Sequence, residues 1–178
     1  MLTDSEIVNA IHQMRAMFPE AGTTLKADTT FHFLLATILS AQSTDKSVNM
    51  VTPPFFARYP TPESLASAEP EDVEPFIQSL GLYHNKAKYL VKAARGIVTN
   101  FNGEVPHTMK ELTSLSGVGR KVANVILAEC FNIPAFPVDT HVSRVARRLE
   151  MVKPNVTVLQ IEKRLKEAVP KDEWLDAH

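Results

Sequence analysis

Cysteine is nearly missing from the sequence, since Cys130 is the only one in 178 residues. A single cysteine excludes an internal disulfide framework and is consistent with a reducing cytoplasm. No apolar run is long enough to cross a bilayer, and no basic-then-apolar secretory signal opens the chain. Alternating strand patterns, low-complexity tracts and internal repeats are also missing. These absences exclude disulfide scaffolds, membrane-spanning proteins and repeat arrays, and indicate a cytoplasmic globular protein.

The net charge of −1 is small, but the charges are unevenly distributed. Residues 1–78 carry 4 Lys and Arg against 10 Asp and Glu, whereas residues 79–178 carry 15 against 10. Halves of opposite sign allow a basic face on a nearly neutral protein, which is the electrostatic requirement for binding nucleic acid. Solvated helices that merely differ in charge are the alternative.

Helical signals cover nearly all of the sequence. Apolar residues recur at a spacing near 3.6, and capping residues followed by Glu or Pro mark several helix starts. We expect helices from the capping box at 3–6, over 31–39, after Thr61 and Glu69, over 86–101, 108–115 and 119–131, from Asp139 to Leu149, and over 157–168. The expected fold class is all-α.

Between two of these helices the sequence reads LSGVGRK, residues 115–121. Two glycines allow backbone angles closed to other residues and let another backbone come close. The amides of this turn and of the next helix's first turn are expected to point outward and, beside basic residues, to bind a DNA phosphate. The candidate DNA-binding residues here are Ser116, Gly117, Val118, Gly119 and Arg120. A plain turn between two helices is the alternative.

Lys121 falls in the first turn of the second helix. There the helix dipole and Arg120 both disfavour a positive charge, and nucleophilic attack requires a neutral amine. Asp139 follows later in the sequence, where it could face Lys121 across one helix length and a turn. Ordinary roles stay open, namely a solvated charge for Lys121 and the N-cap of the next helix for Asp139. Capping and catalysis are compatible, because a cap residue is rigidly held.

Four segments make the chain similar to a known family. They read LLATILSAQSTDKSVN (34–49), IQSLGLYHNKAKYL (77–90), NGEVPHTMKELTSLSGVGRKVANVILAECF (102–131) and PVDTHVSRVARRL (137–149). In this order they resemble the helix-hairpin-helix (HhH-GPD) DNA glycosylases, and the hairpin lysine combined with Val-Asp-Thr-His is highly specific. Ser116 departs from the family pattern, which commonly has Pro there, and this alters the stiffness of the turn and not the chemistry.

The resemblance implies a two-lobed fold. Residues 23–132 would form a six-helix lobe that contains the helix-hairpin-helix at about 108–131. Residues 1–22 together with 133–178 would form a second helical lobe, which is incomplete in this chain.

The resemblance also implies base excision repair by a bifunctional DNA glycosylase and abasic-site lyase that removes oxidised pyrimidines. Lys121 would attack C1′ of the damaged nucleotide, expel the base and form a Schiff base, and β-elimination would then cut the strand 3′ to the abasic site. Asp139 would help to activate the lysine and stabilise positive charge on the sugar. The implied partner is double-stranded DNA with a damaged base or abasic site, bound by a monomer at the nucleoid, with no membrane involved.

A flipped base leaves a gap in the duplex. By the same resemblance, Gln42 is expected to fill this gap and Leu82 to wedge into the duplex. The alternatives are a turn residue for Gln42 and a core residue for Leu82. Asp45, in the same loop as Gln42, is expected to be an N-terminal helix charge, and a role near the lesion is the weaker alternative.

Relatives in this family usually end with four cysteines that hold a 4Fe–4S cluster. This chain stops at His178, before that block would begin, and its one cysteine lies elsewhere, so we expect this chain to bind no cofactor and no metal. Trp174 and Leu175 stand in a last amphipathic segment with nothing after them to complete their environment. This pattern indicates a truncation and a less stable second lobe.

Two other functions stay open. A non-catalytic DNA-binding module would use the hairpin only to hold phosphates, and a monofunctional glycosylase would act on another base. Phosphate binding alone needs neither a lysine at the helix start nor a carboxylate facing it. Lys121 and Asp139 therefore favour the glycosylase and lyase.

Overall fold

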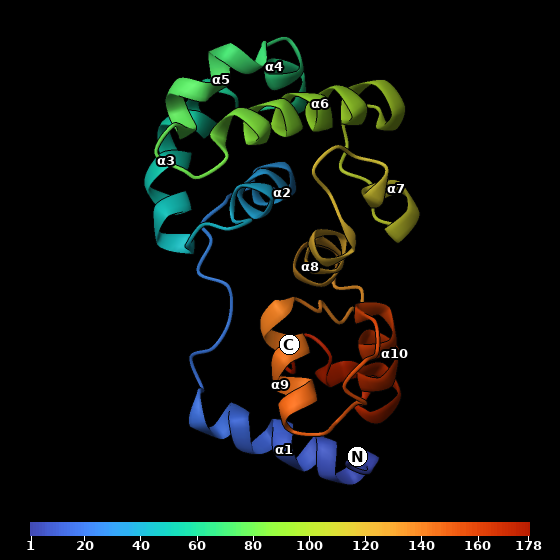
Figure 1. The fold of residues 1–178 in the computed structure, drawn as a ribbon. Coiled ribbons are helices and arrows are strands. Elements are labelled where there is room, and N and C mark those ends of the chain that lie inside the picture. Colours follow the sequence, from blue (N-terminus) through green and yellow to red (C-terminus); the bar gives the residue numbers. More distant parts are fainter. The chain divides into compact units, whose positions relative to one another are not determined.

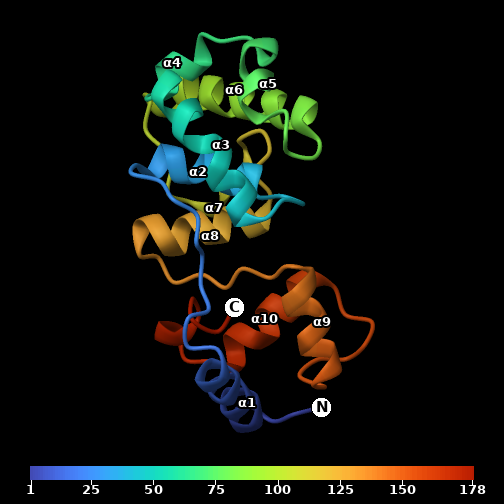
Figure 2. The ribbon, with the colours of Figure 1, turned by 90° about the vertical axis from the view of Figure 1, so that its left-hand side faces the viewer.

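The computed structural model describes residues 1–178 as ten α-helices and one short 3-10 helix, with no strand. The expected all-α fold class is therefore confirmed. The chain forms two compact units, which we call the central unit (23–126) and the terminal unit (1–22 with 127–178). Figure 1 and Figure 2 show the helices of each unit. None of these helices combines the length and the apolar character that crossing a bilayer requires.

The central unit is built around α2, an apolar helix with eight of its ten residues buried. Its helices are α2 (Thr30–Leu39), α3 (Asp45–Arg58), α4 (Pro62–Ala66), α5 (Pro70–Ile77), α6 (Tyr83–Phe101), α7 (Met109–Thr113) and the first part of α8 (Arg120–Phe131). The short helices α4 and α5 pack along the long helix α6 (Figure 1), and α2 packs against both α3 and α6. Burial of α2 on most sides, expected from its sequence, is confirmed.

Local capping signals place most helix starts correctly. Thr61 caps α4, and Pro70 occupies the first position of α5. Asn102 ends α6 in the left-handed conformation, with φ of 53°. Helix α6 begins at Tyr83, ahead of the expected start at 86, because it follows directly on Leu82, which is also left-handed.

Only the start of helix α3 is expected from the sequence, through Asp45 as an N-terminal helix charge, and the sequence analysis gives no range for the helix itself. Pro53 and Pro54 lie inside it, and a proline within a helix removes a backbone hydrogen bond. The helix continues nevertheless, with Val48 and Phe55 fully buried on either side of the prolines. Tertiary burial outweighs local propensity here.

Residues 24–26 are held against the start of α3 by side chains of that helix. One carboxylate oxygen of Asp45 accepts the backbone N–H and the hydroxyl of Thr24, both at 3.0 Å. Asn49 accepts the Lys26 N–H at 2.9 Å and donates to the Thr24 carbonyl at 2.8 Å. Asp45 is thus a first-turn helix charge, as expected, and it also ties down the segment that enters the central unit.

The terminal unit combines both ends of the chain around one apolar core. Its helices are α1 (Asp4–Met17), α9 (Thr140–Arg148), α10 (Val158–Ala168), the 3-10 helix η1 (Lys171–Glu173) and the last part of α8. Ile7 and Ile11 of α1 and Ile161 and Leu165 of α10 share this core with Phe136. Helices α1 and α10 pack against each other although the whole central unit separates them in the sequence.

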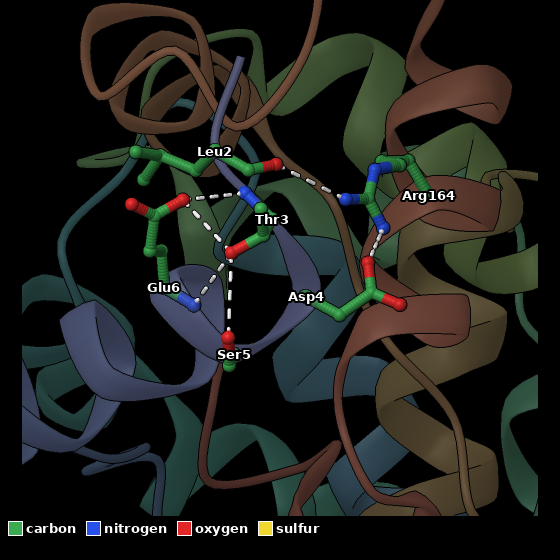
Figure 3. Close-up of polar contacts among 6 residues, drawn as sticks. All are labelled: Leu2, Thr3, Asp4, Ser5, Glu6 and Arg164. Atoms are coloured by element: carbon green, nitrogen blue, oxygen red, sulfur yellow. Dashed lines mark hydrogen bonds and ion pairs between the residues drawn. The ribbon is translucent and has the colours of Figure 1, made fainter.

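The start of α1 is fixed by a capping box and an ion pair (Figure 3). The Thr3 hydroxyl accepts the Glu6 N–H at 3.4 Å, and the Glu6 carboxylate accepts the Thr3 N–H at 2.8 Å, which confirms the expected cap. Arg164 of α10 reaches over with one hydrogen bond to the Asp4 carboxylate (2.6 Å) and one to the Leu2 carbonyl (3.3 Å). These contacts join the two ends of the sequence.

Trp174 has partners, so the expectation that its environment lies incomplete is wrong. Its indole N–H donates to the Val169 carbonyl at 2.9 Å, its ring packs against the core of the terminal unit, and the Lys166 ammonium lies 5.1 Å from the ring centroid. Arg15 of α1 pairs with Asp176 at 2.9 Å. Local sequence patterns do not predict these contacts, because they come from α10 and from the opposite end of the chain.

The division between the units lies inside α8. The central unit ends at Ile126, whereas the lobe boundary expected from the sequence was 132, and the terminal unit resumes at Leu127. Helix α8 is continuous from Arg120 to Phe131, so no break in secondary structure marks this division.

Candidate functional site

The hairpin between α7 and α8 packs closely on the core of the central unit. Thr108 caps α7 by accepting the Glu111 N–H at 3.2 Å. Gly117 has φ of +76°, a left-handed conformation that disfavours other residues. A Cβ added to Gly117 would lie 2.8 Å from Cβ of Tyr89 on α6 and 3.3 Å from Ile38 on α2. Both the backbone angle and the close packing therefore require glycine at 117.

Gly119 differs from Gly117. Its φ lies outside the left-handed region, and a Cβ added there would meet no atom within 4 Å. Gly119 is exposed, and its carbonyl accepts the Ala123 N–H at 3.0 Å, the first hydrogen bond of α8. Neither packing nor the backbone angle explains a glycine at this position. Without a side chain, Gly119 leaves space beside the start of α8.

The amides of the turn do not all face outward. The Val118 N–H donates to the Leu115 carbonyl at 3.2 Å, and the Val118 side chain is buried. This corrects the expectation that every amide of the turn is unpaired. The N–H groups of Ser116, Gly117 and Gly119 have no acceptor within the protein. Three amides of the turn are therefore available to an anion, and Val118 anchors the turn to the core.

Lys121 is the second residue of α8 and is exposed, as is Arg120 before it. Both cations thus stand at the N-terminal end of a helix, directly after the turn that carries Gly117 and Gly119. This placement of Lys121 is the one expected from the sequence.

Asp139, in the terminal unit, caps α9. Its Oδ1 accepts the backbone N–H groups of His141 and Val142, both at 2.8 Å. Two hydrogen bonds to one oxygen fix the rotamer of the carboxylate. The capping role of Asp139 is confirmed, and His141 supplies its backbone to that cap while its side chain is exposed.

Gln42 and Leu82 share a rare backbone conformation. Their φ angles are 55° and 60°, and neither is glycine or asparagine. Both side chains are exposed, with Leu82 at 56%, so the alternative that Leu82 belongs to the core is wrong. Gln42 lies in the turn after α2, and Leu82 is the residue before α6. Left-handed angles at such residues cost energy and persist only where the surroundings impose them.

The two turns that carry these residues are linked by a lysine that the sequence analysis did not select. Nζ of Lys86 donates to Oγ of Ser43 at 2.8 Å, and the Lys86 N–H donates to the Leu82 carbonyl at 2.9 Å. One signal was present in the sequence, since Lys86 stands one helical turn before Leu90 on the apolar face of α6.

The opposite charges of the two sequence halves do not map onto the two units. Within the central unit, residues 62–77 carry 5 Asp and Glu and no Lys or Arg, whereas residues 83–121 carry 7 Lys and Arg against 2 Asp and Glu. The charges are therefore separated between α4–α5 and α6–α8 of one unit. The hairpin and the Leu82 turn belong to the basic part.

The residues of this chain do not fit a 4Fe–4S cluster. Such a cluster takes four thiolates, and Cys130 is one half-buried cysteine on α8. No group of three or more His, Cys, Asp or Glu side chains is arranged to hold a metal ion.

Similarity to known proteins shows which family this chain belongs to. The sequence profile of the HhH-GPD superfamily base excision DNA repair proteins matches residues 35–171. Endonuclease III of Bacillus subtilis (strain 168) is 41% identical over 178 residues, which are 100% of this chain and 81% of that protein. The chain belongs to the endonuclease III family. Within the HhH-GPD superfamily it is therefore a base excision repair DNA glycosylase.

Two solved structures of endonuclease III extend the similarity to the fold. One is a non-covalent endonuclease III–DNA complex, and the other is a trapped endonuclease III–DNA covalent intermediate, an estranged-adenine complex. Each has a TM-score of 0.95 and 43% identity over 100% of this chain, and the chain covers 83% and 84% of them. The resemblance to the HhH-GPD glycosylases that the motifs indicated is confirmed.

Proposed function

We propose that this member of the endonuclease III family is a bifunctional DNA glycosylase and abasic-site lyase that removes oxidised pyrimidines from duplex DNA. The observation that carries the proposal is the place of Lys121, an exposed lysine in the second position of α8, directly after the Gly117–Gly119 turn. A related endonuclease III has been trapped in a covalent intermediate with DNA, which supports a nucleophilic residue in this family. The proposed location of the protein is the cytoplasm, at the nucleoid.

In this proposal the hairpin holds a phosphate of the DNA backbone. The N–H groups of Gly117 and Gly119 have no acceptor in the protein and lie at the positive end of α8. Gly119 leaves the room that a close approach of the backbone needs, and Arg120 adds a positive charge. Such contacts fix the register of the duplex without reading its sequence.

Lys121 then acts as the nucleophile. Its neutral Nζ attacks C1′ of the damaged nucleotide, and the bond from C1′ to the base breaks with its electron pair leaving on the base, which takes up a proton. Opening of the sugar ring gives a Schiff base between Nζ and C1′. Loss of a proton from C2′ and departure of the 3′ phosphate then cut the strand on the 3′ side of the abasic site.

Asp139 has an electrostatic role in the same proposal. Its carboxylate is held by the His141 and Val142 amides, so it needs no reorganisation when positive charge develops on the sugar. It also accepts a proton when the lysine is activated. Lys121 belongs to the central unit and Asp139 to the terminal unit.

Gln42 and Leu82 are proposed to enter the duplex when the damaged nucleotide leaves the stack. Base flipping leaves an unfilled position and an orphaned partner base. The amide of Gln42 offers a donor and an acceptor to that base, and the exposed apolar side chain of Leu82 replaces lost stacking contacts.

Borohydride trapping tests this function directly. Reduction of the Schiff base should give a stable adduct between the wild-type protein and duplex DNA with one abasic site. Lys121→Ala should give none, whereas Lys110→Ala, which removes an exposed lysine from α7 of the same hairpin, should still give the adduct. Adduct formation by Lys121→Ala would identify another nucleophile. Folded wild-type protein that binds abasic DNA without forming an adduct would leave a binding module or a monofunctional glycosylase.

A further inference from the structure

Lys86 is the one lysine that the structure buries. Its exposed fraction is 3%, although it belongs to α6, whose other lysines, Lys88 and Lys92, are exposed. Its ammonium group makes one hydrogen bond, to the Ser43 hydroxyl at 2.8 Å, and no ion pair. A charge taken out of water beside one neutral partner costs folding free energy. Burial accordingly lowers the pKa of Lys86 below the ordinary lysine value.

The partners of Lys86 are specific. Ser43 directly follows Gln42, and the backbone N–H of Lys86 donates to the Leu82 carbonyl. One residue thus holds the turn after α2 through its side chain and the turn before α6 through its backbone. Each of these two turns carries an exposed residue, Gln42 or Leu82, with a left-handed φ angle.

A left-handed conformation at Gln42 and at Leu82 costs free energy and persists only where surrounding contacts impose it. The Leu82 turn has a second support, because Nδ1 of His84 lies 2.8 Å from the Glu74 carboxylate of α5. The loop of Gln42 has no such support from α5. Its side-chain link to α6 is the Lys86–Ser43 hydrogen bond.

We propose that Lys86 is a positioning residue that locks the Gln42 and Leu82 turns into one register, so that both side chains enter the duplex together. The inference rests on the proposed function, because it assigns the lock to the two residues proposed to fill the gap of a flipped base. Lys86 touches no substrate in this scheme. It acts through Ser43 and the backbone of Leu82.

The test uses three variants of the whole chain: Lys86→Met, Ser43→Ala and the double variant. Methionine keeps the volume of the buried stem and removes the charge, so the melting temperature of Lys86→Met should stay equal or rise. Affinity for a duplex with a stable abasic-site analogue should fall about tenfold in each single variant, and affinity for undamaged duplex should stay within about twofold. The double variant should lose no more affinity for this duplex than the single variant that binds it more weakly, since both changes break one link.

Two controls separate the outcomes. Lys92→Met removes the same charge from an exposed position of α6 and should keep the wild-type preference for abasic DNA. Hydrogen exchange should rise at residues 40–44 and 80–85 together in Lys86→Met and in neither segment in Lys92→Met.

Wild-type protein that binds abasic and undamaged duplex equally would overturn both the proposed function and the lock. Wild-type preference that persists in Lys86→Met would overturn the lock alone. Additive losses in the double variant would also overturn it, because independent effects do not come from one shared contact. If Lys86→Met fails to fold, Ser43→Ala tests the lock in its place, by whether the preference for abasic DNA persists.

Discussion

Gly117 and Tyr89 lie so close that a Cβ on the glycine would be 2.8 Å from Cβ of the tyrosine. The hairpin turn is therefore pressed against α6, and its position depends on the absence of a side chain at 117. Gly119, at the end of the same turn, faces open space. One glycine serves packing and the other leaves a surface accessible, and the two roles are separable by experiment.

Gly117→Ala should destabilise the central unit by about 2 kcal/mol or more, because the left-handed backbone angle and the overlap with Tyr89 both oppose a side chain. Gly119→Ala should leave the melting temperature nearly unchanged and weaken DNA binding, because its Cβ occupies room proposed for a phosphate. Thermal unfolding and a DNA-binding titration measure both effects. Equal destabilisation by the two substitutions would contradict the distinct environments of the glycines.

Asp139→Asn should separate the helix-capping role of Asp139 from the proposed role of its negative charge. Asparagine caps a helix about as well as aspartate, so α9 and the melting temperature should stay close to wild type. Base removal under single-turnover conditions should slow by about a hundredfold or more, because the fixed negative charge is gone. Asp139→Ala should also lose about 1 kcal/mol of stability, since alanine offers no acceptor to the His141 and Val142 amides. Unchanged turnover in Asp139→Asn would remove Asp139 from the mechanism.

Lys86 should make stability depend on pH in the alkaline range. Burial lowers its pKa in the folded protein below the ordinary value of 10.5. Between the lowered pKa and 10.5 the unfolded chain binds more protons at this site than the folded chain, so the free energy of unfolding rises with pH there. Urea unfolding of wild type and Lys86→Met across this range should show the difference between them shifting in favour of wild type as pH increases. A constant difference would show that Lys86 is not desolvated.

Thr3→Ala should destabilise the terminal unit by about 1 kcal/mol, because it removes the acceptor for the Glu6 N–H. The Thr3 backbone and hydroxyl together lower the pKa of Glu6, so this cap contributes stability above the ordinary Glu pKa and loses it as pH falls through the lowered value. Trp174 is the only tryptophan and lies in the terminal unit, so its fluorescence follows the unfolding of that unit.

The control is Asn9→Ala, an exposed change in the middle of α1, which should stabilise the terminal unit by a few tenths of a kcal/mol.

Local chemistry made most of the helix starts predictable. Thr3, Thr61 and Thr108 each cap a helix with a hydrogen bond to a residue three positions later, so the signal and the structure lie within one short stretch of sequence. The local placement of the candidate residues was predictable for a similar reason. Lys121 and the glycines stand in one short segment, and the cap at Asp139 involves only the residues that directly follow it.

Contacts between distant segments were not predictable in this way. The burial of Lys86 depends on Ser43, which is 43 residues away, and the partners of Trp174 depend on how α10 turns back. The left-handed angles of Gln42 and Leu82 carry no glycine or asparagine signal, so only tertiary contacts impose them. Helix α3 continues through two prolines for the same reason.

The terminal unit is assembled from the two ends of the sequence, 1–22 and 127–178, with the whole central unit between them. During synthesis α1 leaves the ribosome long before α10, and at roughly 5–20 residues per second this interval is on the order of 10 s. During that interval the apolar face of α1, with Ile7 and Ile11, has no α10 to pack against. The central unit is continuous in sequence, so all of its residues, including the hairpin and its lysine, leave the ribosome before α9 with its capped carboxylate and before α10.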